Sequence, residues 1–102
     1  MKANYSTWCN HEIKAAIKLA EILNEQDNRF LIKKVNSYIH KFHIRKSALD
    51  ELNECEKSYF LEMLLHDTLN NVRENFTGKV ESYLCNVITA IYRNSLETNE
   101  RI

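Results

Sequence analysis

Two histidines, His40 and His43, lie three residues apart in a stretch whose apolar spacing predicts a helix. Side chains at this spacing share nearly one helix face, which is the arrangement that a metal-binding pair requires. A metal site also needs further ligands, whereas the neighbouring Lys41, Arg45 and Lys46 would repel a cation. We therefore expect no metal here, and we interpret both histidines as polar side chains near a helix C-terminus.

A second pair, His66-Asp67, resembles the histidine–aspartate pair of metal-dependent phosphohydrolases of the HD type. Those enzymes also need an earlier histidine, for which His40 could serve, and a later aspartate, whereas Asp67 is the last aspartate of the chain. A helix-surface pair is therefore the favoured interpretation. The sequence also lacks the arginine–histidine spacing of HEPN-type ribonucleases, and it has no glycine-rich phosphate loop. We expect no catalytic residue and no cofactor, although a nucleophile assembled only by the fold would leave little trace in the sequence.

A basic stretch without acids follows the first predicted helix. Bases mixed with aromatic side chains are typical of nucleic-acid binding, because phosphates bind cations and nucleobases stack on rings. Two aromatics here, Tyr38 and Phe42, fall on the apolar stripe, and the whole chain has a net charge of zero. Nucleic-acid binding is therefore the alternative hypothesis. The stretch contains Arg29, and its candidate nucleic-acid-binding residues are Lys33, Lys34, Lys41, Arg45 and Lys46.

An acidic ridge follows the basic stretch, so successive parts of the chain carry charges of opposite sign. On a continuous helix Glu51 and Glu62 would share one edge, with Glu54 beside them. The ridge could neutralise the basic stretch within the molecule, or it could dock a positively charged protein, since complementary charge speeds encounter and selects the partner. Its candidate partner-binding residues are Asp50, Glu51, Glu54, Glu62 and Asp67.

The same asymmetry holds for the two halves of the chain. Residues 1–49 hold nine bases against four acids, and residues 50–102 hold five bases against ten acids. No stretch is apolar enough for a secretory leader or a membrane span, so we expect a cytoplasmic protein that does not enter a membrane. The three cysteines, Cys9, Cys55 and Cys85, are far apart, and we expect buried, reduced thiols.

The elements that must position these residues are predicted to be helices. The 102 residues include one glycine and no proline, so almost nothing in the chain interrupts a helix. We predict an all-α, single-domain bundle of four to five helices. The first helix is expected to begin near Thr7 or Asn10 and to end near Asn24, and a second helix, capped by Asp27 or Asn28, to cover residues 29–43. A short third helix should be opened by a capping box of Ser47 and Asp50 and anchored by Leu49 and Leu52. Two longer helices should cover residues 53–75 and, after a helix stop at Gly78, residues 79–96.

Apolar patterns orient these predicted helices. The first should bury Ile13, Ala16, Ile17, Ala20 and Leu23. Residues 59–65 are apolar nearly all round the helical wheel, which indicates the buried centre of a bundle or a face for a homodimer partner. Residues 97–102 have no apolar stripe and are expected to fray.

In size, helical content and the acidic ridge from Asp50 to Asp67, the chain resembles the small all-helical immunity proteins that bacteria make against delivered toxins. That group includes the immunity proteins of contact-dependent inhibition and bacteriocin systems. The resemblance transfers no individual residue. It implies a cytoplasmic bacterial inhibitor that binds a cationic toxin domain, such as a nuclease, and covers its active site without turnover.

Overall fold

The regular structure that the computed structural model describes is entirely helical. The structure describes residues 10–26 and 28–100, and it describes side chains within residues 13–26 and 28–95. Its four α-helices are α1 (Asn10–Gln26), α2 (Arg29–Ala48), α3 (Glu54–Asn75) and α4 (Gly78–Glu100), and a short 3-10 turn, η2 (Leu49–Glu51), follows α2. The expected all-α bundle is therefore confirmed, and the described residues contain no strand.

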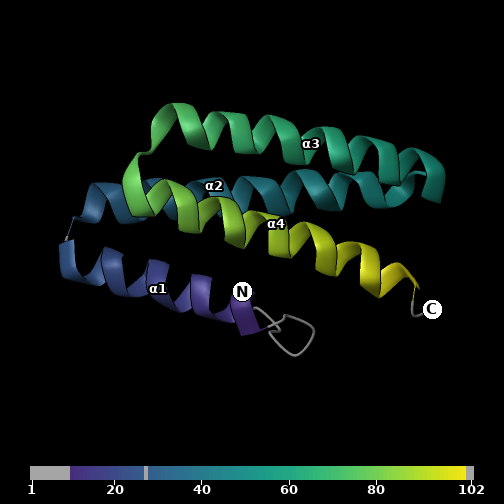
Figure 1. Cartoon of the computed structure of the whole chain (residues 1–102). Helices are drawn as coiled ribbons and strands as arrows, with labels where there is room; N and C mark the ends of the chain where they lie inside the picture. The colour runs from purple at the N-terminus through teal and green to yellow at the C-terminus, as the bar shows by residue number, and fades with distance from the viewer. Residues whose placement is uncertain (1–9, 27, 101–102) are drawn as a thin grey trace.

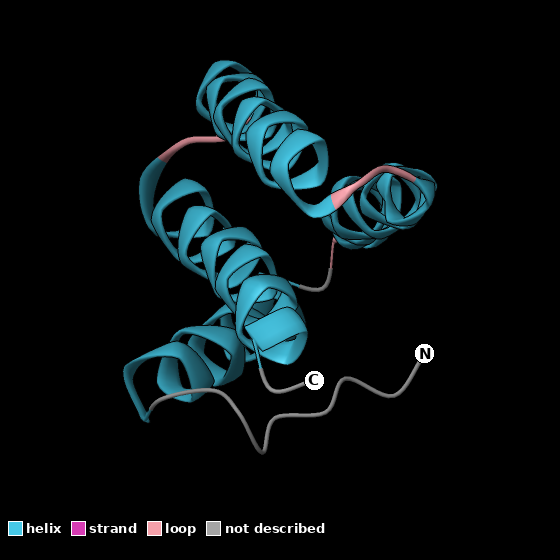
Figure 2. Ribbon diagram, turned by 90° about the vertical axis from the view of Figure 1, so that its right-hand side faces the viewer, coloured by secondary structure: helices cyan, strands magenta, loops and turns pink. Residues whose placement is uncertain are grey.

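Consecutive helices run in opposite directions (Figure 1). Helix α4 packs against both α1 and α3, while α2 packs mainly against α3. The turned view shows the consequence, because α1 and α3 lie on different sides of α4 and α2 lies beside α3 (Figure 2). Helix α4 is therefore the central helix, and α3 packs against α4 and α2 while its opposite side stays uncovered.

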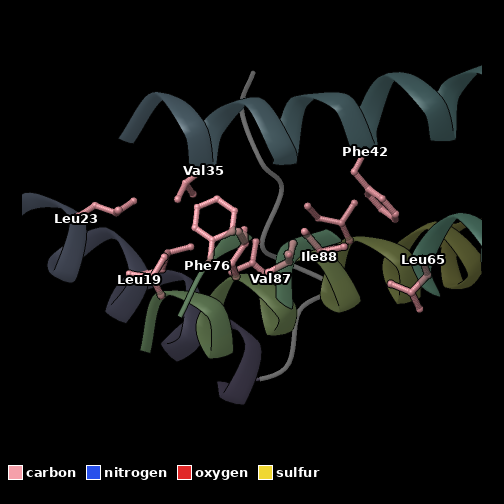
Figure 3. Packing of buried hydrophobic residues seen from close by; sticks show 12 residues of the cluster. Leu19, Leu23, Val35, Phe42, Leu65, Phe76, Val87 and Ile88 are labelled. Atoms are coloured by element: carbon pink, nitrogen blue, oxygen red, sulfur yellow. The ribbon is translucent and has the colours of Figure 1, made fainter. Parts of the chain in front are cut away.

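The core gathers one apolar stripe from each helix. The predicted seam of α4 is confirmed, because Val80, Leu84, Val87 and Ile91 are all buried. Val35 and Phe42 face this seam from α2, as the spacing of their helix predicts. Figure 3 shows the side chains of Leu19, Val35 and Val87 around the ring of Phe76, so this loop residue joins three helices to the core.

Asparagine side chains cap the N-termini of two helices, α2 and α3. The side chain of Asn28 accepts a hydrogen bond of 3.2 Å from the backbone N–H of Leu31, which confirms one of the two expected caps of α2. The other candidate, Asp27, lies outside the described residues. Asn53 caps α3 by accepting a 2.9 Å bond from the N–H of Glu56, and its amide donates back to the Glu56 carboxylate. Local chemistry thus fixes where α2 and α3 begin.

The predicted capping box at Ser47 is wrong. Ser47 lies inside α2, which continues to Ala48, and the following η2 has no side-chain cap. No breaker stands between residues 43 and 48, so the helix continues past its expected end. The chain then extends at Leu52 and Asn53 before α3 begins. The expected third helix is therefore a three-residue turn, and Leu49 and Leu52 are only half-buried.

The apolar face of α1 is also rotated from its predicted position. Ile17 is 51% exposed and Ala20 is exposed, whereas Leu19 and Leu23 are buried. The predicted burial of Leu23 is confirmed, but the packing against α4 buries it together with Ala15 and Leu19, at four-residue steps, rather than with Ile17 and Ala20. At the other end of the chain, α4 continues to Glu100, and residues 101–102 of the expected frayed tail lie outside the described residues.

Candidate protein-docking surface

Helix α3 leaves an unpartnered apolar face. Tyr59, Phe60 and Met63 are 62%, 43% and 46% exposed, and we call these three residues the α3 face. The rings of Tyr59 and Phe60 meet edge-on, with their centroids 5.4 Å apart. The predicted buried centre at residues 59–65 is therefore wrong for these three side chains, because they lie on the uncovered side of α3, whereas Leu61 and Leu65 lie on the buried side.

Carboxylates alternate with the α3 face along the helix. Glu62 lies three residues after Tyr59, and Asp67 lies four residues after Met63, so each is a surface neighbour of an apolar member. Glu56 lies three residues before Tyr59 and four before Phe60, so it is also a surface neighbour, although the predicted ridge did not include it. All three acids are exposed. The α3 face is therefore apolar at its centre with three carboxylates on its rim, and the one base at the same spacing, Lys57 before Phe60, is paired with Asp50.

The remaining acids of the predicted ridge lie elsewhere. Asp50 and Glu51 are on η2, and the extended backbone at Leu52 separates them from α3, so the continuous helix assumed for the ridge does not exist. Asp50 also forms an ion pair with Lys57, with 2.7 Å between the charged atoms. Glu54 is exposed in the first turn of α3, five residues before Tyr59. These three acids form a separate anionic end of the bundle.

The basic residues of α2 do not form one patch. Lys34, Lys41 and Arg45 are seven and four residues apart, so they share the side of α2 that faces α3, whereas Lys33 and Lys46 are each adjacent to a member of this row and point elsewhere. Within the described residues, no ion pair joins these five bases to the acids between Asp50 and Asp67. Internal neutralisation of the two charged stretches is therefore not observed there.

His40, His43 and His66 are not gathered into a metal site. His66 lies 3.9 Å from the Glu62 carboxylate rather than pairing with Asp67. His43 is half-buried, and its pKa is lowered by burial and then by the charges of Lys46 and His40. Among the described residues, no three histidine, cysteine or acidic side chains lie close enough together to hold a metal ion.

The two described thiols differ in their surroundings. Cys55 is exposed, which corrects the expectation of burial, and Cys85 is half-buried. Burial raises the pKa of the Cys85 thiol, and the nearby Glu81 carboxylate raises it further. Cys9 lies outside the described residues.

Comparisons with protein-family models, with curated proteins and with solved structures find no match to this chain. Among the described residues, no helix combines the length and the apolar character needed to cross a bilayer.

Proposed function

We propose that this protein is a non-catalytic inhibitor that binds another protein through the α3 face, and that its partner is a cationic toxin domain. The observation that carries the proposal is the cluster of exposed Tyr59, Phe60 and Met63 within a carboxylate rim. Large apolar side chains gathered on the surface of a soluble domain mark interaction sites, and aromatic residues and methionine are enriched at the centres of interfaces.

The charge of the rim selects the kind of partner. Glu56, Glu62 and Asp67 would meet like charges on an acidic partner, at a cost of several kcal/mol. A basic surface satisfies the same carboxylates and is attracted before contact. A nuclease cleft is basic because it binds phosphates, so these acids would occupy positions that substrate phosphates otherwise take. The inhibition is then steric and electrostatic, and it requires no turnover.

We assign the protein to the immunity or antitoxin type because its size, its helical content and its surface all suit a protein that acts by covering another. The alternative, a helical regulator that binds nucleic acid, receives less support, since Lys33 and Lys46 do not share the row formed by Lys34, Lys41 and Arg45. Lys34 is moreover engaged with the end of α3 through the carbonyl of Asn75.

The test uses the product of the gene adjacent to that of this protein, because immunity proteins are usually encoded beside their toxins. We expect the two proteins to co-purify, and we expect excess inhibitor to abolish the activity of the toxin domain. Met63→Lys should prevent both effects, since it places a cation at the centre of the α3 face. Toxin activity that is unchanged in excess inhibitor would contradict the proposal.

A matched control separates this effect from a general loss of surface apolarity. Ile44→Lys introduces the same charge at an exposed apolar position of α2, where the side chain is 55% exposed, and it should leave binding intact. Circular dichroism should show that both variants fold. Light scattering tests whether a second copy of the chain occupies the α3 face instead. If the wild type is a homodimer and Met63→Lys dissociates it, the α3 face serves self-association and the proposal is contradicted.

A further inference from the structure

A small pocket lies between α2 and α3, away from the α3 face. Its volume is about 100 Å³. Phe42 and Thr68 are buried, so they close its inner side, and the remaining lining residues reach the surface. The lining comprises Tyr38, Lys41, Phe42 and Arg45 from α2, and Thr68 and Asn71 from α3.

Two cations line this pocket together. Lys41 and Arg45 are one helical turn apart on the side of α2 that faces α3, and both are exposed. Neither forms an ion pair with an acid of the described residues. The third base of the row, Lys34, instead donates to the carbonyl of Asn75 and lies over the ring of Phe76. The pocket therefore carries two positive charges that no described carboxylate compensates.

The lining also determines which groups can donate a hydrogen bond. The hydroxyl of Thr68 donates to the carbonyl of Leu64 at 2.7 Å, so its proton is not available to a ligand. The available donors are the ammonium of Lys41, the guanidinium of Arg45, the amide of Asn71 and the hydroxyl of Tyr38. This set consists of two charged and two neutral donors, which suits an anion with several oxygen atoms.

We propose that this pocket binds a phosphate group. A phosphate dianion balances both cations, whereas a carboxylate would leave one positive charge uncompensated. Arginine binds phosphate oxygens in a bidentate manner, and lysine adds a point charge. A pocket of about 100 Å³ accommodates a single tetrahedral group and leaves the remainder of a larger molecule in solvent.

The test is a titration of the isotope-labelled protein with inorganic phosphate, followed by amide NMR shifts at constant ionic strength. We expect saturable shifts centred on Tyr38, Lys41, Arg45 and Asn71, and weaker binding of acetate under the same conditions. Lys41→Gln and Arg45→Gln should each weaken phosphate binding about tenfold, since each removes a charge-assisted bond.

Lys33→Gln is the matched control, because it removes a base from α2 outside the row that faces α3, and it should leave the binding unchanged. Shifts that do not saturate, equal responses to phosphate and acetate, or equal losses in Lys33→Gln and Lys41→Gln would overturn the proposal. The phosphate pocket shares no residue with the α3 face, so the Lys41→Gln variant should still inhibit the toxin partner. The two proposals can therefore fail separately.

Discussion

The ammonium of Lys34 lies 4.9 Å from the centroid of the Phe76 ring, which places a cation over an aromatic face at the junction of α2 and α3. The same ammonium donates a 3.1 Å hydrogen bond to the carbonyl of Asn75, the last residue of α3. A positive charge stabilises the C-terminal end of a helix, where carbonyl groups lack partners. The ring of Tyr38 also contacts Phe76, edge-on and with the two centroids 5.1 Å apart. One lysine thus helps to secure the turn between α3 and α4.

Replacement of Lys34 by alanine should lower the free energy of unfolding by about 0.5 to 1 kcal/mol, because it removes a partly exposed cation–π contact and the charge at the end of α3. Urea denaturation followed by circular dichroism measures the change. Lys33→Ala is the control, since it removes an exposed lysine with no such contact and should have a smaller effect. Equal losses in the two variants would contradict the role of Lys34.

Gly78 should tolerate asparagine better than alanine. Its φ is +64°, in the left-handed region, and a Cβ atom built there meets no heavy atom within 4 Å. The cost of substitution is therefore conformational rather than steric. We expect Gly78→Ala to lower the free energy of unfolding by about 1 to 2 kcal/mol and Gly78→Asn by less, because asparagine visits this region more readily. Thermal denaturation would rank the variants, and an alanine variant as stable as the wild type would contradict this account.

The features that the sequence predicts well are those determined by local residue chemistry. The absence of proline predicts the all-α class, and the three- and four-residue apolar spacing of α4 predicts its buried seam. The cap at Asn28 and the turn at Gly78 follow from residues that act on the backbone within a few positions of themselves. None of these predictions requires knowledge of which helix packs against which.

The features that the sequence misses depend on tertiary packing. Leu19 is buried and Ile17 is exposed because α4 selects one of two overlapping stripes on α1. Phe76 stands in a polar loop and is nevertheless buried by helices distant in sequence. Tyr59 and Met63 are exposed because no helix of the described residues covers their side of α3, and the apolar pattern of residues 59–65 does not reveal which side is covered. The candidate docking surface is therefore visible only in the fold.

Stability should fall as the pH is lowered past the ordinary histidine pKa. The pKa of His43 is lowered in the folded protein, chiefly by burial and then by Lys46. The unfolded chain therefore takes up a proton first, so the stabilisation is complete above the unfolded pKa of about 6.5 and is lost as the pH falls through the folded pKa. Urea midpoints at about pH 7.5 and pH 5.5 should differ, and His43→Gln should reduce that difference.

Lys46→Gln provides a second test of the same cause, because removing a neighbouring positive charge should raise the pKa of His43 towards its ordinary value. The difference between the two urea midpoints should then shrink without loss of the histidine. A pH dependence that is the same in the wild type and in both variants would assign the effect to other groups.

The carboxylate rim of the α3 face should control how fast the proposed toxin partner associates. Glu62→Gln combined with Asp67→Asn removes two exposed charges beside Tyr59 and Met63 while retaining similar side-chain volumes. We expect the association rate constant at low salt to fall about tenfold, with a small change in dissociation, because rim charges act mainly by steering. Stopped-flow or surface-binding kinetics measure both constants.

Salt should remove most of that difference, because the screening length falls from about 10 Å at 0.1 M to about 3 Å at 1 M ionic strength. Glu25→Gln, which removes an exposed charge on α1, is the control and should leave the association rate nearly unchanged. If the double variant associates as fast as the wild type at low salt, the rim does not steer the partner. If it associates slowly at every salt concentration, the two acids contribute short-range contacts rather than long-range attraction.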